Sequence, residues 1–274
     1  MAEADKVFSR SIPEFYDTYL VPLIFETFAA DLAGRVAAAK PLSVLETAAG
    51  SGGVTRSLAP LLAADAKYTV TDLNQPMLDH AARQQGSDGR IRWQQADALH
   101  LPFPDGHFDV VCCQFGVMFF PDRVAGYREA LRVLKPGGKF VFNAWDRIEH
   151  NVFADTVTKA AAAIFPDDPP MFLARTPHGY HDAAAIRADV KAAGFADVSI
   201  ETVTENSAAA SHRDPAIAFC QGTPLRNEIE MRDASALERV TEAAAGAIRA
   251  AFGDGPVSAK IQGHVVTAIA PGAV

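Results

Sequence analysis

The stretch LETAAGSGGVT, residues 45–55, decides the fold class of this chain. The run before it, LSVLET (42–47), has the apolar and β-branched composition of a buried strand. The run after it, GVTRSLAPLLAA (53–64), has apolar residues at helical spacing. Small residues between them let the backbone take positive φ values and approach a ligand closely. The stretch therefore predicts a strand, a ligand-binding turn and a helix. The simpler alternative is a turn that only connects the strand to the helix and binds no ligand.

The same alternation of strand and helix continues along the chain. Helical patterns that end in Gly or Pro–Gly separate the strand-like runs. This order predicts an α/β fold with a mostly parallel, doubly wound sheet and helices on both of its faces. The expected strands are 42–47, 67–72, 91–97, 108–115, 139–145, 195–203 and 263–270, and the expected helices between the early strands are 53–64, 75–86 and 123–138.

Two regions depart from this alternation. One or two helices are expected ahead of the first strand, in 1–40, and about 60 helix-rich residues separate the last two strands. An insertion of that length caps a site or serves assembly more often than it simply connects two strands. We therefore expect a core formed by 41–204 with 263–274, helices in 1–40 that belong to a cap, and a helical insertion in 205–262.

The composition limits the class of protein. The 274 residues carry 25 basic and 33 acidic side chains, a net charge of −8, which disfavours nucleic acid or an anionic membrane as the main partner. The N-terminal segment lacks the apolar core of a signal peptide, and no apolar run approaches 18 residues. Cys112, Cys113 and Cys220 lack metal-ligand spacing and are expected to be buried thiols. These features predict a cytoplasmic protein without a membrane span or a metal site.

Two carboxylates follow later strands at the edge of the sheet where the loop is expected. Asp72 ends the second strand, about 20 residues beyond the loop, where an acidic side chain can accept both hydroxyls of a ribose. A dinucleotide site and an S-adenosylmethionine site both predict this residue. Asp97 ends the third strand, where a carboxylate can accept the exocyclic amine of adenine. Asp97 therefore favours the second kind of site.

The motifs around Asp97 extend this argument. QQADALHLPFPDGHFDVV (94–111) is followed by FGVMFFPD (115–122) and by YREALRVLKPGGKFVF (127–142). With the loop, this ordered set resembles the class I S-adenosylmethionine-dependent methyltransferases, in the group of the ubiquinone/menaquinone C-methyltransferases (methyltransferase type 11). The resemblance covers about 41–145 and thins to the element at 194–198. It implies a Rossmann-like sheet of seven strands with an antiparallel last strand.

The resemblance also implies roles for individual residues in binding S-adenosylmethionine, which leaves as S-adenosylhomocysteine. Glu46 would order the loop and the methionine amino group, Asp72 would bind the ribose, and Asp97 with the backbone of Ala98 would read the adenine. Ala48 departs from the commonest pattern, which has Gly at that position. The remaining implied contacts are Gly50 and Gly52 beneath the methionine and ribose, Leu73 or Met77 against the adenine, Gln114 and Phe115 beside the sulfonium, and Tyr16 and Tyr19 from the N-terminal helix.

The methyl acceptor is less well defined by the sequence. Trp145 ends the fifth strand and is expected to wall the acceptor pocket, and His150, a weaker candidate, is the best-placed catalytic histidine. Because methyl transfer is an in-line displacement, alignment and exclusion of water matter most, and an oxygen or nitrogen acceptor needs a base only to lose its proton. We expect a largely apolar small-molecule acceptor, bound by the N-terminal helices, 146–180 and 205–262.

Two alternatives from other classes remain at this point. An NAD(P)-dependent oxidoreductase would use the same loop, but Asp97, the LKPGG element and the lack of a Tyr-x-x-x-Lys pair disfavour it. A non-catalytic protein that binds S-adenosylmethionine is the other. The identity of the acceptor, the methylated atom, the pathway and the oligomeric state, with a homodimer among the alternatives, stay open.

Overall fold

The computed structural model describes residues 15–272, so residues 1–14 of the predicted cap and 273–274 of the predicted core lie outside it. The chain divides into two compact units. Unit 1 comprises Met1–Phe25, Trp145–Tyr180 and Val203–Gly263, and unit 2 comprises Glu26–Ala144, His181–Thr202 and His264–Val274. Each unit therefore combines segments that are far apart in the sequence.

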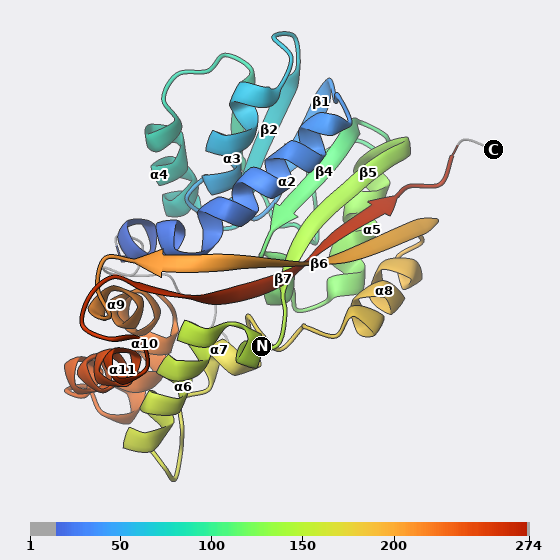
Figure 1. Cartoon of the computed structure of the whole chain (residues 1–274). Helices are drawn as coiled ribbons and strands as arrows, with labels where there is room; N and C mark the ends of the chain where they lie inside the picture. The colour runs from blue at the N-terminus through green and yellow to red at the C-terminus, as the bar shows by residue number, and fades with distance from the viewer. Residues whose placement is uncertain (1–14, 273–274) are drawn as a thin grey trace. The chain divides into compact units, whose positions relative to one another are not determined.

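The seven strands of the structure follow the order β3-β2-β1-β4-β5-β7-β6, and the first five of them run parallel (Figure 1). In parallel strands all carboxyl ends lie at one edge, and the order reverses between β1 and β4, which is where ligands bind in doubly wound sheets. The bounds are β1 (Ser43–Glu46), β2 (Lys67–Asp72), β3 (Ile91–Gln95), β4 (Phe108–Gln114), β5 (Leu134–Trp145), β6 (Asp197–Ala209) and β7 (Val257–Ile269).

The last strand of the chain is antiparallel, as the resemblance implied. The amide of Ala270 donates to the carbonyl of Gly138, and the amide of Asp146 donates to the carbonyl of Gln262. Residue numbers thus fall along β7 as they rise along β5, the signature of an antiparallel pair. The strands β6 and β7 begin or end in unit 2 and continue into unit 1.

Helices pack on both faces of the strands within unit 2. On one face Tyr127 of α5 contacts the rings of Phe140 and Phe142 of β5. On the other face Thr55 of α3 binds the Glu46 side chain of β1. The elements of this unit that flank the strands are α2 (Glu26–Ala38), α3 (Gly53–Leu58), η3 (Ala59–Leu61), α4 (Gln75–Gln85), η4 (Val117–Phe119), α5 (Arg123–Val133) and α8 (Ala183–Ala192). Asp182 caps α8 by accepting the amide of Ala184 at 2.8 Å.

Unit 1 is built mainly from helices. Among them α11 packs against α9 and α6, and α9 packs against η2 (Figure 1). The elements are η2 (Tyr16–Phe25), a π-helical segment, η5 (Ile148–His150), α6 (Val152–Ile164), α7 (Phe172–Arg175), α9 (Arg213–Gln221), α10 (Leu225–Arg232) and α11 (Leu237–Phe252). The helix-rich composition of the insertion therefore corresponds to three helices, α9 to α11.

The predicted boundaries were wrong at several strand ends. The sequence predicted β5 from residue 139, but it begins at Leu134; β6 runs to Ala209 and β7 starts at Val257. Pro136 and the two glycines after it suggested a helix stop and turn, whereas the strand includes them as an irregularity, because Leu134 pairs with Phe108 and the regular register with β4 resumes at Lys139. The predicted insertion 205–262 thus includes parts of both strands. Its sequence from 227 to 253 predicts a helical segment, which the structure divides near Asp233 between α10 and α11.

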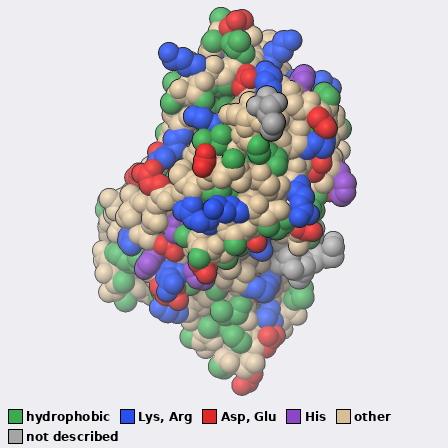
Figure 2. Space-filling model, turned by 90° about the vertical axis from the view of Figure 1, so that its right-hand side faces the viewer, with side chains coloured by type: hydrophobic (Ala, Val, Ile, Leu, Met, Phe, Trp, Pro, Cys, Tyr) green, Lys and Arg blue, Asp and Glu red, His purple; other side chains and the backbone are tan. Residues whose placement is uncertain are grey.

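The surface carries both signs of charge. On the face in view in Figure 2, Lys and Arg side chains are interspersed with Asp and Glu. The three cysteines are buried and free, as expected. Within residues 15–272, no helix combines the length and hydropathy that a membrane-spanning segment needs.

Candidate functional site

The loop after β1 has the strained backbone that its composition predicted. Gly50 and Gly52 have φ values of 57° and 81°, and Ala48 has φ 52° although it is not glycine. The loop is fixed to the end of β2, because the amide of Ala49 donates to the carbonyl of Thr71 at 3.0 Å. Left-handed backbone of this kind is uncommon outside glycine and clusters at functional sites. The structure therefore places a rigid, small-residue loop at the carboxyl end of β1.

Glu46 lies beneath this loop and is 1% exposed. One oxygen of its carboxylate accepts hydrogen bonds from the hydroxyls of Thr55, at 2.6 Å, and Tyr68. Burial raises the pKa of Glu46 to about 7, and hydrogen bonds from Thr55 and Tyr68 oppose that increase. Glu46 thus ties β1 to α3 and β2, which supports its predicted ordering role. Its predicted contact with a methionine amino group stays a prediction.

Asp72 joins the loop to the start of α4. Its Oδ2 accepts the amide of Gly50 at 2.8 Å, and its Oδ1 accepts the amide of Asn74 at 2.7 Å. Burial raises its pKa, and the two backbone N–H groups partly offset the effect of burial. A carboxylate oxygen can accept two hydrogen bonds, so these contacts are compatible with further hydroxyl donors. Asp72 as a whole is 9% exposed and is the last residue of β2.

The residues predicted around an adenine follow β2 and β3. Leu73 is 55% exposed although it is apolar, whereas Met77 is 6% exposed. The Met77 methyl carbon lies 4.0 Å from the place that a Gly50 Cβ would occupy, so Met77 lies close to the loop. The Asp97 side chain is 46% exposed and accepts the amide of Leu99 at 2.9 Å. Asp97 is two residues beyond Gln95, the register partner of Asp72, and Ala98 follows it.

The end of β4 adds a second strained position beside the loop. Phe115 has φ 50°, and its ring contacts Phe28 of α2 edge-on at 5.2 Å. Gln114, before it, is the last residue of β4 and is half-buried. The next residue, Gly116, was not singled out by the sequence reasoning. A Cβ at Gly116 would lie 2.5 Å from the Cβ of Ala48, so the two turns approach each other too closely for a side chain there.

These groups fit S-adenosylmethionine by the chemistry of their donors and acceptors. Asp72 and Asp97 offer carboxylate oxygens to hydroxyl and amine donors, and Leu73 offers an exposed apolar surface to a planar base. Side chains are disfavoured at Gly50 and Gly52, whose φ values are positive, and at Gly116, where a Cβ would meet Ala48. Unit 2 therefore brings together these predicted cofactor contacts: Glu46, Ala48, Gly50, Gly52, Asp72, Leu73, Met77, Asp97, Ala98, Gln114 and Phe115.

The other predicted contacts lie in unit 1. Tyr16 and Tyr19 belong to η2, where Tyr16 contacts Phe25 at 5.4 Å between ring centroids and Tyr19 stacks on Phe15 at 6.1 Å. Trp145 is 3% exposed and contacts Phe25 and His178, each at 6.0 Å. These contacts show the aromatic packing of unit 1. The predicted roles of both tyrosines toward the cofactor and of Trp145 toward the acceptor stay predictions.

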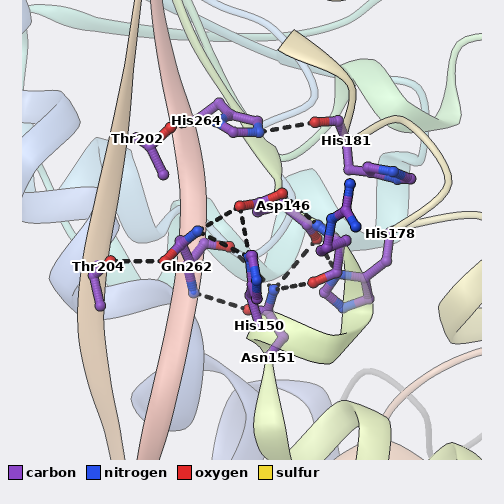
Figure 3. A network of polar contacts seen from close by, with 10 residues as sticks. Asp146, His150, Asn151, His178, His181, Thr202, Thr204, Gln262 and His264 are labelled. Atoms are coloured by element: carbon purple, nitrogen blue, oxygen red, sulfur yellow. Dashed lines mark hydrogen bonds and ion pairs between the residues drawn. The ribbon is translucent and has the colours of Figure 1, made fainter.

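His150 lies in a polar network just beyond β5 (Figure 3). Its Nδ1 is 3.0 Å from Oδ2 of Asp146, and its side chain is 42% exposed whereas that of Asp146 is 10% exposed. The amide nitrogen of Gln262 donates to the same Asp146 oxygen. His178 binds the Asp146 carbonyl through Nδ1 at 2.8 Å. A half-exposed imidazole held by a buried carboxylate can accept a proton at its other nitrogen.

Sequence reasoning missed the partners of His150. Asp146 and Asn151 follow Trp145 within six residues, but Gln262 is more than a hundred residues away and stood only in the expected insertion. Nothing in a strand pattern marks a glutamine as part of a site, because an amide side chain has no distinctive spacing.

In unit 2 a separate pair joins the Nδ1 of His264 to the hydroxyl of Thr202 at 3.0 Å. Among residues 15–272, no three His, Cys, Asp or Glu side chains are grouped to hold a metal ion.

Comparisons with known proteins identify relatives among the methyltransferases. Residues 45–142 match the methyltransferase domain family. The chain is 30% identical over 182 residues to the ubiquinone/menaquinone biosynthesis C-methyltransferase UbiE of Shewanella woodyi, covering 62% of this chain and 72% of that protein. It is 37% identical over 120 residues to the protein of the same name from Shewanella sediminis, covering 42% and 48%.

Two solved structures show the same fold at low identity. The YcgJ protein of Bacillus subtilis has a TM-score of 0.57 at 19% identity, covering 89% of this chain and 99% of that one. The phosphoethanolamine N-methyltransferase 2 of Haemonchus contortus, crystallised with phosphomonomethylethanolamine and S-adenosylhomocysteine, has a TM-score of 0.51 at 16% identity, covering 97% and 62%.

Proposed function

This chain belongs to the class I S-adenosylmethionine-dependent methyltransferases, and on that basis we propose that it methylates a small, largely apolar acceptor. The observation that carries the acceptor class is the lining of a small cavity within unit 1. Its walls are mostly apolar and aromatic: Ile24, Trp145, Phe153, Ala154, Phe219 and Ile261, with Asn151 and His178. Pockets for small molecules combine such walls with a few polar groups.

The cavity sets a condition on binding. Its volume of about 10 Å³ is close to the space that one water molecule needs, so these side chains must separate before a larger molecule enters. Trp145 is then the proposed wall of the acceptor pocket. The proposed acceptor-binding parts are the helices of 1–40, 146–180 and the insertion 205–262, with Tyr16 and Tyr19 on the first of these, while 41–204 with 263–274 forms the cofactor-binding core.

The proposed contacts to the cofactor follow the geometry of unit 2. Asp72 accepts the ribose hydroxyls, Asp97 and the backbone of Ala98 read the adenine amine, and Leu73 or Met77 covers the ring. Glu46 holds the loop formed by Ala48, Gly50 and Gly52 under the methionine and ribose, and Gln114 and Phe115 lie by the sulfonium. Their support is the rigid loop, the hydrogen bonds of Asp72 and the exposed carboxylate of Asp97.

The residues of this chain have limited chemistry to perform. When bound, S-adenosylmethionine supplies a methyl group on a positively charged sulfur that is ready for in-line displacement. The protein gains most by aligning the acceptor behind that methyl group and by excluding water. His150 is the proposed proton acceptor where the attacking atom must first lose a proton, because its imidazole is half-exposed and bound to a buried carboxylate.

The proposed setting is the cytoplasm, with a small molecule and not nucleic acid as the acceptor. The net charge of −8 supports this, since a nucleic-acid backbone binds basic surfaces. A homodimer is a further proposal, for which the long insertion is the only support, and gel filtration with light scattering tests it.

One experiment tests the acceptor class. The protein is incubated with S-adenosylmethionine labelled in its methyl group and with a cell extract separated by ultrafiltration into small-molecule and macromolecular fractions. We expect the label in small molecules that partition into an organic solvent. Label transferred only to protein or nucleic acid would contradict the small-molecule proposal. Binding of S-adenosylhomocysteine without any transfer would favour a non-catalytic binding protein, and binding of NAD alone would favour the oxidoreductase alternative.

A further inference from the structure

Gln262 occupies the centre of the polar network that holds His150 (Figure 3). Its amide nitrogen donates to Oδ2 of Asp146 at 2.5 Å, and its amide oxygen accepts the hydroxyl of Thr204 at 2.9 Å. Gln262 is 9% exposed and Asp146 is 7% exposed. An ionised carboxylate only accepts hydrogen bonds, so the amide must present its nitrogen to Asp146 and its oxygen to Thr204. The orientation of the Gln262 side chain is therefore fixed at both ends.

The backbone of Gln262 is fixed as well. Asn151 accepts the Gln262 amide with its Oδ1 at 3.1 Å and donates to the Gln262 carbonyl with its Nδ2 at 3.1 Å. The Asp146 amide donates to that same carbonyl at 3.1 Å. Asn151 is 2% exposed, so these bonds are shielded from water. The network thus holds β7 and the segment after β5 at one spacing within unit 1.

The distances around Oδ2 of Asp146 decide where the proton of His150 lies. Nδ1 of His150 is 3.0 Å from Oδ2 and 3.0 Å from the Gln262 nitrogen. The Gln262 amide nitrogen has two N–H groups, so one of them can donate to Oδ2 while the other points toward Nδ1, and the charge on Asp146 decides between the two tautomers of His150. A bare Nδ1 lone pair facing an ionised oxygen would be repelled, whereas Nδ1–H donating to it forms a charge-assisted bond. The proton of neutral His150 therefore belongs on Nδ1, which leaves the lone pair on Nε2.

We propose that Gln262 is a positioning residue that, with Thr204, holds Asp146 in the orientation that keeps His150 as the tautomer with a basic Nε2. This rests on the proposed function, in which His150 takes a proton from the methyl acceptor. In that step the hydrogen of an acceptor O–H or N–H bonds to Nε2, and its electron pair stays on the acceptor atom. Asp146 then stabilises the imidazolium that forms.

The other charged groups near His150 are few. Arg147 and Glu149 belong to the same segment, and the Arg147 amide donates to Oδ1 of Asp146 at 2.7 Å. His178 binds the Asp146 carbonyl, and β6 and β7 contribute the neutral side chains of Thr204 and Gln262. A carboxylate introduced at 262 would thus face Asp146 and His150 directly. Its negative charge would stabilise the imidazolium form of His150, because an opposite charge nearby favours the charged form.

The first test needs no acceptor. Two-dimensional ¹⁵N NMR of histidine-labelled full-length protein, with the His150 signals assigned from their loss in His150→Gln, reports which ring nitrogen carries the proton. We expect Nδ1–H and a bare Nε2 in the unaltered protein. A neutral imidazole with its proton on Nε2 would overturn the proposal, whatever the outcome for binding of S-adenosylhomocysteine.

The second test separates positioning from simple structural support. In Gln262→Glu we expect the His150 pKa, followed by NMR, to rise by at least about 1 unit, and the acidic limb of methyl transfer to the labelled extract acceptor to move equally. Activity should then recover at alkaline pH. Gln262→Leu, which keeps the volume and removes the amide, should lower kcat more than it alters KM at every pH.

The matched control is Gln221→Glu, the same change on α9, where Gln221 meets Thr241 at 3.4 Å. Gln221→Glu should leave the His150 pKa and the pH dependence of the methyl-transfer rate unchanged. An equal shift in both variants, or no shift in Gln262→Glu while that variant still binds S-adenosylhomocysteine, would overturn the role of Gln262. Failure of the unaltered protein to bind S-adenosylhomocysteine would instead count against the proposed function.

Discussion

At the level of single residues, the loop after β1 depends on where a Cβ can fit. Gly52 has φ 81°, and a Cβ there would lie 2.9 Å from the Cβ of Ala81 on α4. Ala48 has a positive φ without being glycine, and Gly116 opposite it leaves room for its methyl group. The small residues of this loop thus meet two requirements, a left-handed backbone and close packing against neighbouring elements. Composition alone does not distinguish these two requirements.

We expect Gly52→Ala to lower the free energy of unfolding by about 2–4 kcal/mol, from left-handed strain and from overpacking against Ala81. The control is Gly53→Ala, the next residue. A Cβ at Gly53 meets nothing within 4 Å, and Gly53 begins α3. Because Ala favours helix over Gly, this variant should be neutral or more stable by up to about 1 kcal/mol. Equal losses in urea unfolding would contradict the steric argument.

Glu46 makes the stability of the protein depend on pH. Its pKa of about 7 in the folded state lies above the ordinary value of 4.5, so the folded state binds the proton more tightly than the unfolded chain. The resulting stabilisation is complete below about pH 4.5 and is lost as the pH rises through 7. The difference is on the order of 3 kcal/mol.

Glu46→Gln should remove this dependence, because an amide oxygen still accepts from Thr55 and Tyr68 but does not titrate. Urea unfolding at pH 5 and pH 7.5 measures it, with a smaller fall for the variant than for the unaltered protein. Glu201→Gln is the control, because Arg35 lowers the pKa of the exposed Glu201, which gives a contribution of opposite sign. If the free energy of unfolding fell between pH 5 and pH 7.5 by the same amount in Glu46→Gln as in the unaltered protein, Glu46 would not be the source of the pH dependence.

At the level of elements, α5 holds the loop that carries Asp97. The Arg132 guanidinium donates to the carbonyls of Leu101 and Phe103 at 2.9 and 2.8 Å, and Glu129 accepts the Leu101 amide at 2.8 Å. Arg132 also bonds Glu129, so the two side chains act as one clamp. A loop without regular structure thus acquires a fixed path between β3 and β4.

We expect Arg132→Lys to destabilise the protein by about 1–3 kcal/mol and to weaken binding of S-adenosylhomocysteine, since a single ammonium cannot reproduce the planar fork. Arg128→Lys on the same helix is the control, because Arg128 makes one long contact of 3.4 Å to the Ala192 carbonyl. Calorimetric titration and urea unfolding measure both effects. Equal results for the two variants would show that the clamp does not order the loop.

For the whole molecule, the proposed cofactor contacts other than Tyr16 and Tyr19 belong to unit 2, so a bound ligand should stabilise the fold mainly through that unit. At 100 times its dissociation constant, S-adenosylhomocysteine should add about 2.7 kcal/mol and raise the Tm by about 5–10 °C. Asp72→Ala should weaken binding by about 1–3 kcal/mol and shrink the shift accordingly, and Asp79→Ala, at an exposed site on α4, should not. If S-adenosylhomocysteine raised the Tm of the Asp72 variant by as much as that of the unaltered protein, Asp72 would not be part of the cofactor site.

The sequence by itself determined the parallel half of the fold. Five strands, the helices between them and the positions of Glu46, Asp72 and Asp97 all follow from local patterns, because strand period, helix period and turn residues act over neighbouring positions. The ends of β5, β6 and β7 did not, since their pairing depends on partners distant in the chain. The split of the insertion at Asp233 was missed for a similar reason, as tertiary packing decides where a helical pattern stops.

Only the tertiary structure decided the surroundings of His150. The sequence placed His150 after β5, but it gave no sign that Gln262, far along the chain, would bind Asp146 beside it. Antiparallel pairing of β5 with β7 brings these residues together, and such pairing joins positions whose spacing in the sequence is arbitrary. The loop LETAAGSGGVT can be recognised in the sequence because its backbone conformation requires small residues at neighbouring positions. The proposed proton-accepting network forms only when strands that are distant in the sequence pair with each other.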